Sequence, residues 1–150
     1  MAFTGTSLID GNGLFPPRDP LVPDWLEKHH VRYRVYTSGL SFFILFGAPQ
    51  VFGPNFRNID RLAADVANEQ PGDYPQVIIV EPSYGDSARI TGAICNDYHA
   101  PVAAGPGEVF VRRVYDALTR NPARWAKTVL LVMFDEHGGF YRWAFGCPAS

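Results

Sequence analysis

Two adjacent carboxylates, Asp135 and Glu136, follow a run of apolar residues at 128–134. The run predicts a buried strand, so both side chains are expected to be partly desolvated at its end. Such neighbours repel each other unless a cation lies beside them, and their oxygen atoms suit Mg, Ca, Mn, Zn or Fe. Gly138 and Gly139 would let the backbone turn sharply near a ligand. We therefore interpret Asp135 and Glu136 as ligands of a divalent metal ion; the alternative is a solvated turn capped by Asp135.

Histidines and a third carboxylate are candidates for further roles. His99 lies in a long aperiodic segment, residues 83–106, where it could bind metal, contact phosphate or protonate a leaving group. A loop histidine is more often simply exposed, but we keep His99 as the candidate catalytic residue. His137 is either a further ligand or proton carrier, or a histidine of a surface turn. Glu81 ends a second apolar run, and is either a carboxylate supporting the site or only a strand end.

No nucleophile can be chosen from spacing. The sequence has no Gly-x-Ser-x-Gly turn, no phosphate-binding glycine loop with a lysine, and no His-Glu-x-x-His motif. The Gly-Pro-Gly at 105–107 precedes a predicted helix and is a weak signal for anion binding.

The elements that must position these residues alternate between helices and strands. Helices are predicted at 25–30, 59–67 (capped by Asn58) and 107–120, strands at 31–36, 76–80 and 128–134, and either a strand or a helical turn at 41–46. Residues 1–24, rich in Gly and Pro, are expected to be an irregular lead-in to a partial α/β domain at 25–150. The order predicts parallel strands, whose carboxyl ends are the usual place for ligands.

Composition narrows the class of protein. The 150 residues are 47% hydrophobic, 14% aromatic and 19% charged with a net charge of −2, which indicates a globular chain and disfavours nucleic acid as a partner. No apolar run is long enough to span a membrane, and the first residues do not resemble a signal peptide. Cys95 and Cys147 have no zinc-site spacing, and a disulfide between them stays open, as does the oligomeric state.

Residues 125–141, Trp-Ala-Lys-Thr-Val-Leu-Leu-Val-Met-Phe-Asp-Glu-His-Gly-Gly-Phe-Tyr, closely resemble the signature of the bacterial phospholipase C and acid phosphatase phosphoesterase family. Earlier blocks resemble that family in the same order, at residues 31–36, 75–84, 96–99, 107–108 and 114–118. The resemblance extends over about residues 20–141, and its last block is the most specific.

The resemblance implies part of an alkaline-phosphatase-like α/β sandwich with a mostly parallel sheet. It implies hydrolysis of phosphate mono- or diesters, with phospholipids as one substrate class. It also implies that Asp135 and Glu136 bind a divalent metal and that His99 lies near the phosphate. Family members are often exported, so a secreted or periplasmic location is expected for the full-length protein.

The sequence departs from the family pattern at both ends. No match to the family's Glu-Asn metal pair or hydroxyl nucleophile is found, and Arg142 and Trp143 replace an expected acid and histidine. We therefore expect a fragment of a longer enzyme that is inactive alone. The alternative is a non-catalytic α/β remnant that acts as a binding or structural module. A sulfatase-like hydrolase is less favoured, because no Cys or Ser sulfatase signature is present.

Overall fold

The computed structural model describes residues 20–85, 88, 92, 94–99 and 103–134. Asp135, Glu136, His137 and Cys147 lie outside these residues. In chain order the elements, with 3-10 helices written η, are α1 (Val22–Lys28), β1 (Tyr33–Thr37), η1 (Phe42–Phe46), η2 (Pro49–Phe52), β2 (Phe56–Asn58), η3 (Ile59–Arg61), α2 (Leu62–Asn68), η4 (Pro71–Asp73), β3 (Val77–Glu81), α4 (Gly105–Leu118) and α5 (Pro122–Trp125).

The strands form a parallel sheet in the order β2-β1-β3. Val35 pairs with Phe56 of β2, and Thr37 lies opposite both Asn58 and Glu81. The prediction of an α/β fold with parallel strands is confirmed. Because the strands are parallel, all three end at the same edge of the sheet, which we call the carboxyl edge.

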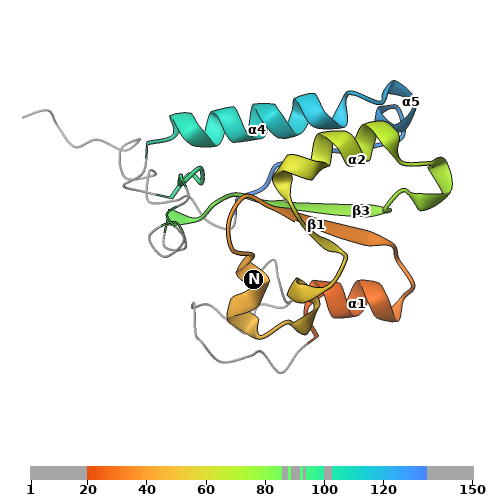
Figure 1. Ribbon diagram of the computed structural model, residues 1–150, viewed down its shortest axis with the longest axis horizontal. Helices are drawn as coiled ribbons and strands as arrows, with labels where there is room; N and C mark the ends of the chain where they lie inside the picture. The colour runs from red at the N-terminus through yellow and green to blue at the C-terminus, as the bar shows by residue number, and fades with distance from the viewer. Residues whose placement is uncertain (1–19, 86–87, 89–91, 93, 100–102, 135–150) are drawn as a thin grey trace, which may run out of the picture.

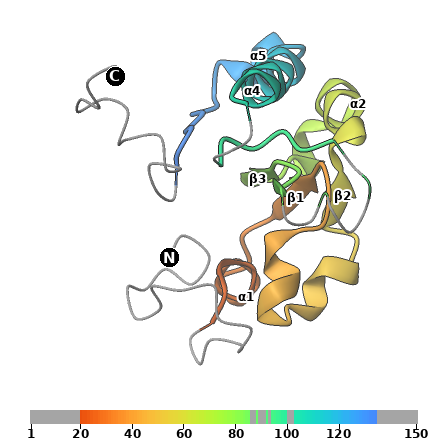
Figure 2. The same ribbon diagram turned by 90° about the vertical axis from the view of Figure 1, so that its left-hand side faces the viewer.

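Helices cover both faces of the sheet, with α2, α4 and α5 on one side and α1, η1 and η2 on the other (Figures 1 and 2). The side chains of β3 alternate between these layers. Ile78 and Val80 pack against the cluster formed with α2 and α4, whereas Val77 and Ile79 pack against the cluster formed with α1 and η1. A strand that is covered on both faces, as β3 is with its four apolar side chains partly buried, is apolar in its sequence, which is how β3 could be recognised.

Most predicted elements are present with shifted ends. The strand predicted at 31–36 is β1, that at 76–80 is β3, and the helix predicted at 107–120 is α4. Asn58 caps the helical segment as predicted, since its side chain accepts a hydrogen bond from the Asp60 backbone N–H at 2.8 Å. None of the helices within the described ranges is long and apolar enough to cross a membrane.

Two helical segments differ from the simplest expectation. The first helix begins at Val22 and not at 25, because Asp24 accepts a hydrogen bond from the Leu21 N–H at 2.9 Å and Pro23 fits the first turn. Residues 41–46, which were open between strand and helix, form the 3-10 helix η1, capped by the Ser41 side chain.

The prediction of a strand at residues 128–134 is wrong. The described residues show no backbone ladder to this run, whose first N–H donates to the Trp125 carbonyl of the unpredicted helix α5 at 3.0 Å. A strand needs a hydrogen-bonded neighbour as well as an apolar sequence. Leu130 packs against the core, but Val129 and Met133 are 82% and 76% exposed.

Ion pairs join α2 to the sheet and to α5. Glu69, which follows α2, pairs with Arg34 of β1 and, at 3.3 Å, with Arg124 of α5. Asp65 pairs with Arg57 at 2.7 Å and accepts a hydrogen bond from the Tyr36 hydroxyl at 2.8 Å. These pairs are partly buried, so each charge has its partner where water is scarce.

A buried carboxyl group lies at the end of β3. The Glu81 side chain is 2% exposed, and its Oε1 accepts a hydrogen bond from the Phe42 N–H of η1 at 3.1 Å. Desolvation raises the pKa of Glu81 from 4.5 to about 7, against the opposing effects of the Ser41 hydroxyl and the Phe42 N–H. Glu81 therefore joins η1 to the sheet in a form that easily keeps its proton.

Replacing Glu81 by Gln should remove a pH dependence of stability. The folded state holds the Glu81 proton more tightly than the unfolded state, so the free energy of unfolding should fall as pH rises from about 4.5 to about 7. The fall should be roughly 3 kcal/mol, from 1.4 kcal/mol per pKa unit. Urea unfolding at several pH values would measure it.

Glu81→Gln should lose this fall, whereas the exposed control Glu27→Gln should keep it. A Glu81→Gln profile parallel to that of the wild type over this range would contradict the assignment.

Candidate functional site

The connections that leave β1 and β3 pass to opposite faces of the sheet. After β1 the chain forms η1, whose Phe43 is buried in one cluster, and after β3 it leads to α4, whose Phe110 and Val114 are buried in the other. β1 and β3 are neighbours in the sheet. In open α/β sheets, ligand sites lie beyond the carboxyl ends of neighbouring strands whose connections diverge in this way.

Polar side chains gather at this point of the carboxyl edge. The Asn96 side chain accepts a hydrogen bond from the Ser83 N–H at 2.6 Å and donates one to the Ser38 hydroxyl at 3.1 Å. The Asn96 N–H also donates to the Ser83 carbonyl at 3.1 Å. Asn96 thus connects the residues that follow β1 and β3, although these lie far apart in the sequence.

Asp97 extends the same connection. It is 7% exposed, and its two carboxylate oxygens accept hydrogen bonds from the Gly85 N–H and the Cys95 thiol, both at 2.9 Å. Burial and this bond to Asp97 raise the pKa of the Cys95 thiol, so the thiol is held in its protonated form.

Two buried oxygen atoms at the edge have no hydrogen-bond partner among the described residues. They are Oε2 of Glu81 and Oγ of Ser83, a side chain that is 0% exposed. A Cβ on Gly39 would lie 2.9 Å from that Ser83 oxygen, so the glycine allows the chain after β1 to approach closely. Buried oxygens without a hydrogen-bond partner cost free energy, and Gln50 Oε1 is a further such atom elsewhere among the described residues.

Tyr98 packs between α4 and the apolar run. Its ring lies against Gly107, where an added Cβ would come within 2.7 Å of it, and meets the Phe134 ring edge to face at 5.4 Å between centroids. The glycine at 107 therefore makes room for Tyr98, and the described residues give no support to an anion cradle there. Phe134 is the residue before Asp135, and Tyr98 is the residue before His99.

The three predicted site residues have different outcomes. His99 is described and exposed, and it follows Tyr98 at the carboxyl edge. Asp135 and Glu136 lie outside the described residues, so their role as metal ligands stays a prediction. Within the described ranges no three His, Cys, Asp or Glu side chains come together as a metal site would require.

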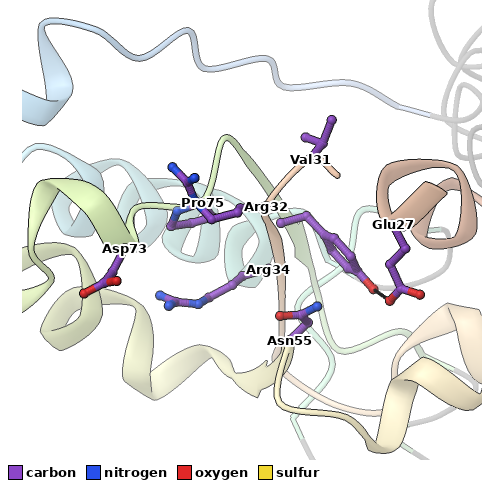
Figure 3. A pocket seen from close by; sticks show the side chains of 8 residues that line it. Glu27, Val31, Arg32, Arg34, Asn55, Asp73 and Pro75 are labelled. Carbon is purple, nitrogen blue, oxygen red and sulfur yellow. Dashed lines mark hydrogen bonds between the residues drawn. The ribbon is translucent and has the colours of Figure 1, made fainter. Parts of the chain in front are cut away.

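A pocket lies at the other end of the sheet (Figure 3). It is lined by Glu27, Val31, Arg32, Tyr33, Arg34, Asn55, Asp73 and Pro75. The Tyr33 hydroxyl donates to Glu27 at 2.7 Å, and burial together with this bond raises the pKa of Tyr33 to about 12. Arg32 donates to the Tyr74 carbonyl at 3.1 Å, and Arg34 is paired with Glu69. With its cations engaged and two acids present, the pocket is a poor place for a phosphate.

Sequence reasoning missed the polar residues that follow the strands. Ser38 comes directly after β1, Ser83 comes two residues after β3, and Asn96 lies in the motif that ends in His99. The available signal was the position of hydroxyl and amide side chains just beyond predicted strand ends. Their convergence depends on which strands are neighbours, and a single sequence does not provide that.

Comparisons with a family model and with individual known proteins point to the same family. A sequence model of the Phosphoesterase family matches residues 18–144. The chain is 39% identical over 70 residues to non-specific phospholipase C6 of Arabidopsis thaliana, covering 47% of this chain and 13% of that protein. It is 36% identical over 85 residues to hemolytic phospholipase C of Pseudomonas aeruginosa, covering 57% and 10%.

Phospholipase C A of Mycobacterium tuberculosis matches a longer stretch, with 31% identity over 129 residues, which is 81% of this chain and 24% of that protein. The chain thus spans between about a tenth and a quarter of the length of these three relatives. The family match extends from before α1 to beyond the Asp135 and Glu136 pair. The chain belongs to the Phosphoesterase family.

Proposed function

We propose that this chain forms part of an enzyme site that hydrolyses phosphate mono- or diesters at the carboxyl edge. The observation that carries the proposal is the family match over residues 18–144, which includes His99 and the acidic pair. Two features of the fold support it. The connections of β1 and β3 diverge at this edge, and the Tyr98–Phe134 contact joins the segments that precede His99 and Asp135.

A divalent metal ion fits the chemistry of the residues assigned to it. Asp135 and Glu136 would hold the ion through carboxylate oxygens, the ligands that hard cations prefer. When bound, the ion would supply Lewis-acid polarisation of the phosphoryl oxygens. His99 would contact the phosphate or protonate the leaving group, and its exposure at the edge leaves it accessible to a substrate.

The substrate class follows from the relatives. Those named above are phospholipases C, and phospholipids are therefore one class of phosphodiester that we propose for this site. Mono- and diesters share the phosphoryl group that the metal and His99 would address.

Replacing Asp135 by Asn should weaken metal binding. Calorimetric titration of this chain with Mg²⁺, Ca²⁺, Mn²⁺ and Zn²⁺ should show binding of at least one ion to the wild type. Asp135→Asn should bind that ion at least about tenfold more weakly, because an anionic ligand becomes neutral. A matched control is Asp116→Asn, which removes an exposed carboxylate that pairs with Arg112 on α4.

Asp116→Asn should leave metal affinity unchanged. In the longest natural chain that carries this sequence, Asp135→Asn should also abolish hydrolysis of bis-p-nitrophenyl phosphate. Wild-type turnover in that variant would overturn the assignment. A wild-type chain with no affinity for any of the four ions would favour the alternative, a non-catalytic binding or structural module.

This chain by itself should turn over bis-p-nitrophenyl phosphate slowly or not at all. The reason is that no residue in it matches the family's hydroxyl nucleophile, so a metal site alone would lack the covalent step. Spectrophotometric assays with each of the four ions would test this. Robust metal-dependent turnover would show that the nucleophile is present in these residues.

A further inference from the structure

We infer that Tyr98 is a positioning residue for the proposed metal ligands: its ring, held on α4, fixes Phe134, the residue that precedes Asp135. The inference rests on the proposed function, in which Asp135 and Glu136 hold a divalent metal ion. Tyr98 itself need not contact the metal or a substrate.

The first step concerns how the apolar run at 128–134 is held. Its first N–H donates to the Trp125 carbonyl of α5 at 3.0 Å, and the described residues show no backbone ladder farther along it. Leu130 packs against the core in the middle of the run, whereas Phe134 at its end is 62% exposed. Side-chain contacts, and not a strand ladder, must therefore hold the end of the run that leads to Asp135.

The second step is that the Tyr98 ring supplies such a contact. It meets the Phe134 ring edge to face, with 5.4 Å between the centroids and 88° between the planes. This arrangement is attractive because the edge of an aromatic ring is positive and its face is negative. Phe134 is joined to Asp135 by one peptide bond, so a contact that restricts Phe134 also restricts where the chain delivers that carboxylate.

The third step is that the core in turn holds Tyr98. A Cβ at Gly107 would lie 2.7 Å from its ring, so the ring lies directly against the α4 backbone there. Desolvation and a side-chain hydrogen bond to Glu108 raise the pKa of Tyr98, so its hydroxyl stays protonated beside the first turn of α4. Phe110 is buried in the cluster that α4 shares with α2 and the sheet. The core thus fixes α4, and α4 fixes the ring that meets Phe134.

The chain offers a matched aromatic pair near the other end of α4. Tyr115 meets the Trp125 ring edge to face, with 5.5 Å between the centroids and 82° between the planes. Tyr115→Ala therefore removes the same kind of contact from the same helix. Either loss should lower the melting temperature, but only the loss of the Tyr98 ring should affect the chain beside Asp135.

The experiment compares wild type, Tyr98→Ala, Tyr98→Phe and Tyr115→Ala in this chain, below the melting temperature of each. It uses calorimetric titration with Mg²⁺, Ca²⁺, Mn²⁺ and Zn²⁺. The ion that the wild type binds should bind about three- to tenfold more weakly to Tyr98→Ala. Tyr98→Phe, which keeps the ring, and Tyr115→Ala should both keep an affinity close to that of the wild type. Wild-type affinity in Tyr98→Ala, or an equal loss in Tyr115→Ala, would overturn the inference.

A second readout needs no metal, because it follows Phe134 itself by NMR. The heteronuclear ¹H–¹⁵N NOE of the Phe134 amide should fall in Tyr98→Ala, since the ring contact restricts its motion. It should stay at the wild-type value in Tyr98→Phe and Tyr115→Ala. A Phe134 amide that is equally ordered in Tyr98→Ala would count against the inference.

A double-mutant cycle tests whether Tyr98 acts through Phe134 and not through its neighbour His99. Phe134→Leu removes the partner ring at a position that is 62% exposed, so this variant should fold. In that background Tyr98→Ala should weaken metal binding much less than it does in the wild type. An undiminished effect would contradict the route through Phe134.

Gly107→Ala keeps the test decisive if Tyr98→Ala does not fold. The added Cβ would displace the Tyr98 ring from α4, and metal binding should weaken in the same direction. A folded Gly107→Ala with wild-type metal affinity and a wild-type Phe134 NOE would overturn the inference.

The same titrations separate this inference from the proposed function. If Asp135→Asn weakens metal binding and Tyr98→Ala does not, the proposed metal site stands and the inference falls. If the wild type binds none of the four ions, the proposed metal site falls and the positioning role falls with it.

Discussion

The parallel ladder between β1 and β3 brings Thr37 opposite Glu81, so that two chain segments far apart in the sequence leave the sheet at one edge. The side chains of β1 and β3 pack against one set of helices on one face of the sheet and against another set on the other face. The connections diverge, and the backbone groups just beyond the strands are left to be satisfied by side chains. The Asn96 side chain satisfies the Ser83 N–H, and the Asp97 carboxylate satisfies the Gly85 N–H.

Two polar residues at this edge, Asn96 and Glu81, differ in how their side chains are hydrogen-bonded. The Asn96 amide uses both its oxygen and its nitrogen in hydrogen bonds and joins segments, whereas Glu81 keeps one buried oxygen unpaired and has a raised pKa. A hydrogen-bonded amide adds specificity at little cost in free energy, but a buried carboxylate with an unpaired oxygen is costly unless it is protonated. Proteins tolerate such costs most often at functional sites, which agrees with a site at the carboxyl edge.

The sequence predicted well where one local pattern decides the structure. The apolar run of β3, the amphipathic helix α4 and the Asn58 cap are all set by neighbours within a turn or a strand. The strand prediction at 128–134 failed because an apolar sequence does not by itself supply a neighbouring strand to hydrogen-bond with. The short strand β2 and the helix α5 were missed because three or four residues carry little periodicity.

The candidate site was predictable only in part. His99 and the acidic pair stood out by residue type and by the family resemblance. Their roles as catalytic residue and metal ligands remain predictions. The roles of Ser38 and Asn96 were hidden, because their hydrogen bond joins residues 58 positions apart. Such contacts follow from the order of strands in the sheet, which no local pattern specifies.

Paramagnetic broadening by Mn²⁺ tests the central claim most directly, since it reports which end of the sheet receives the metal. The account predicts that substoichiometric Mn²⁺ broadens the amide resonances of Ser83, Tyr98 and His99 at the carboxyl edge, and that Asp135→Asn removes the effect. Broadening centred instead on Arg32 and Tyr33 at the amino end, or persisting in Asp135→Asn, would contradict it.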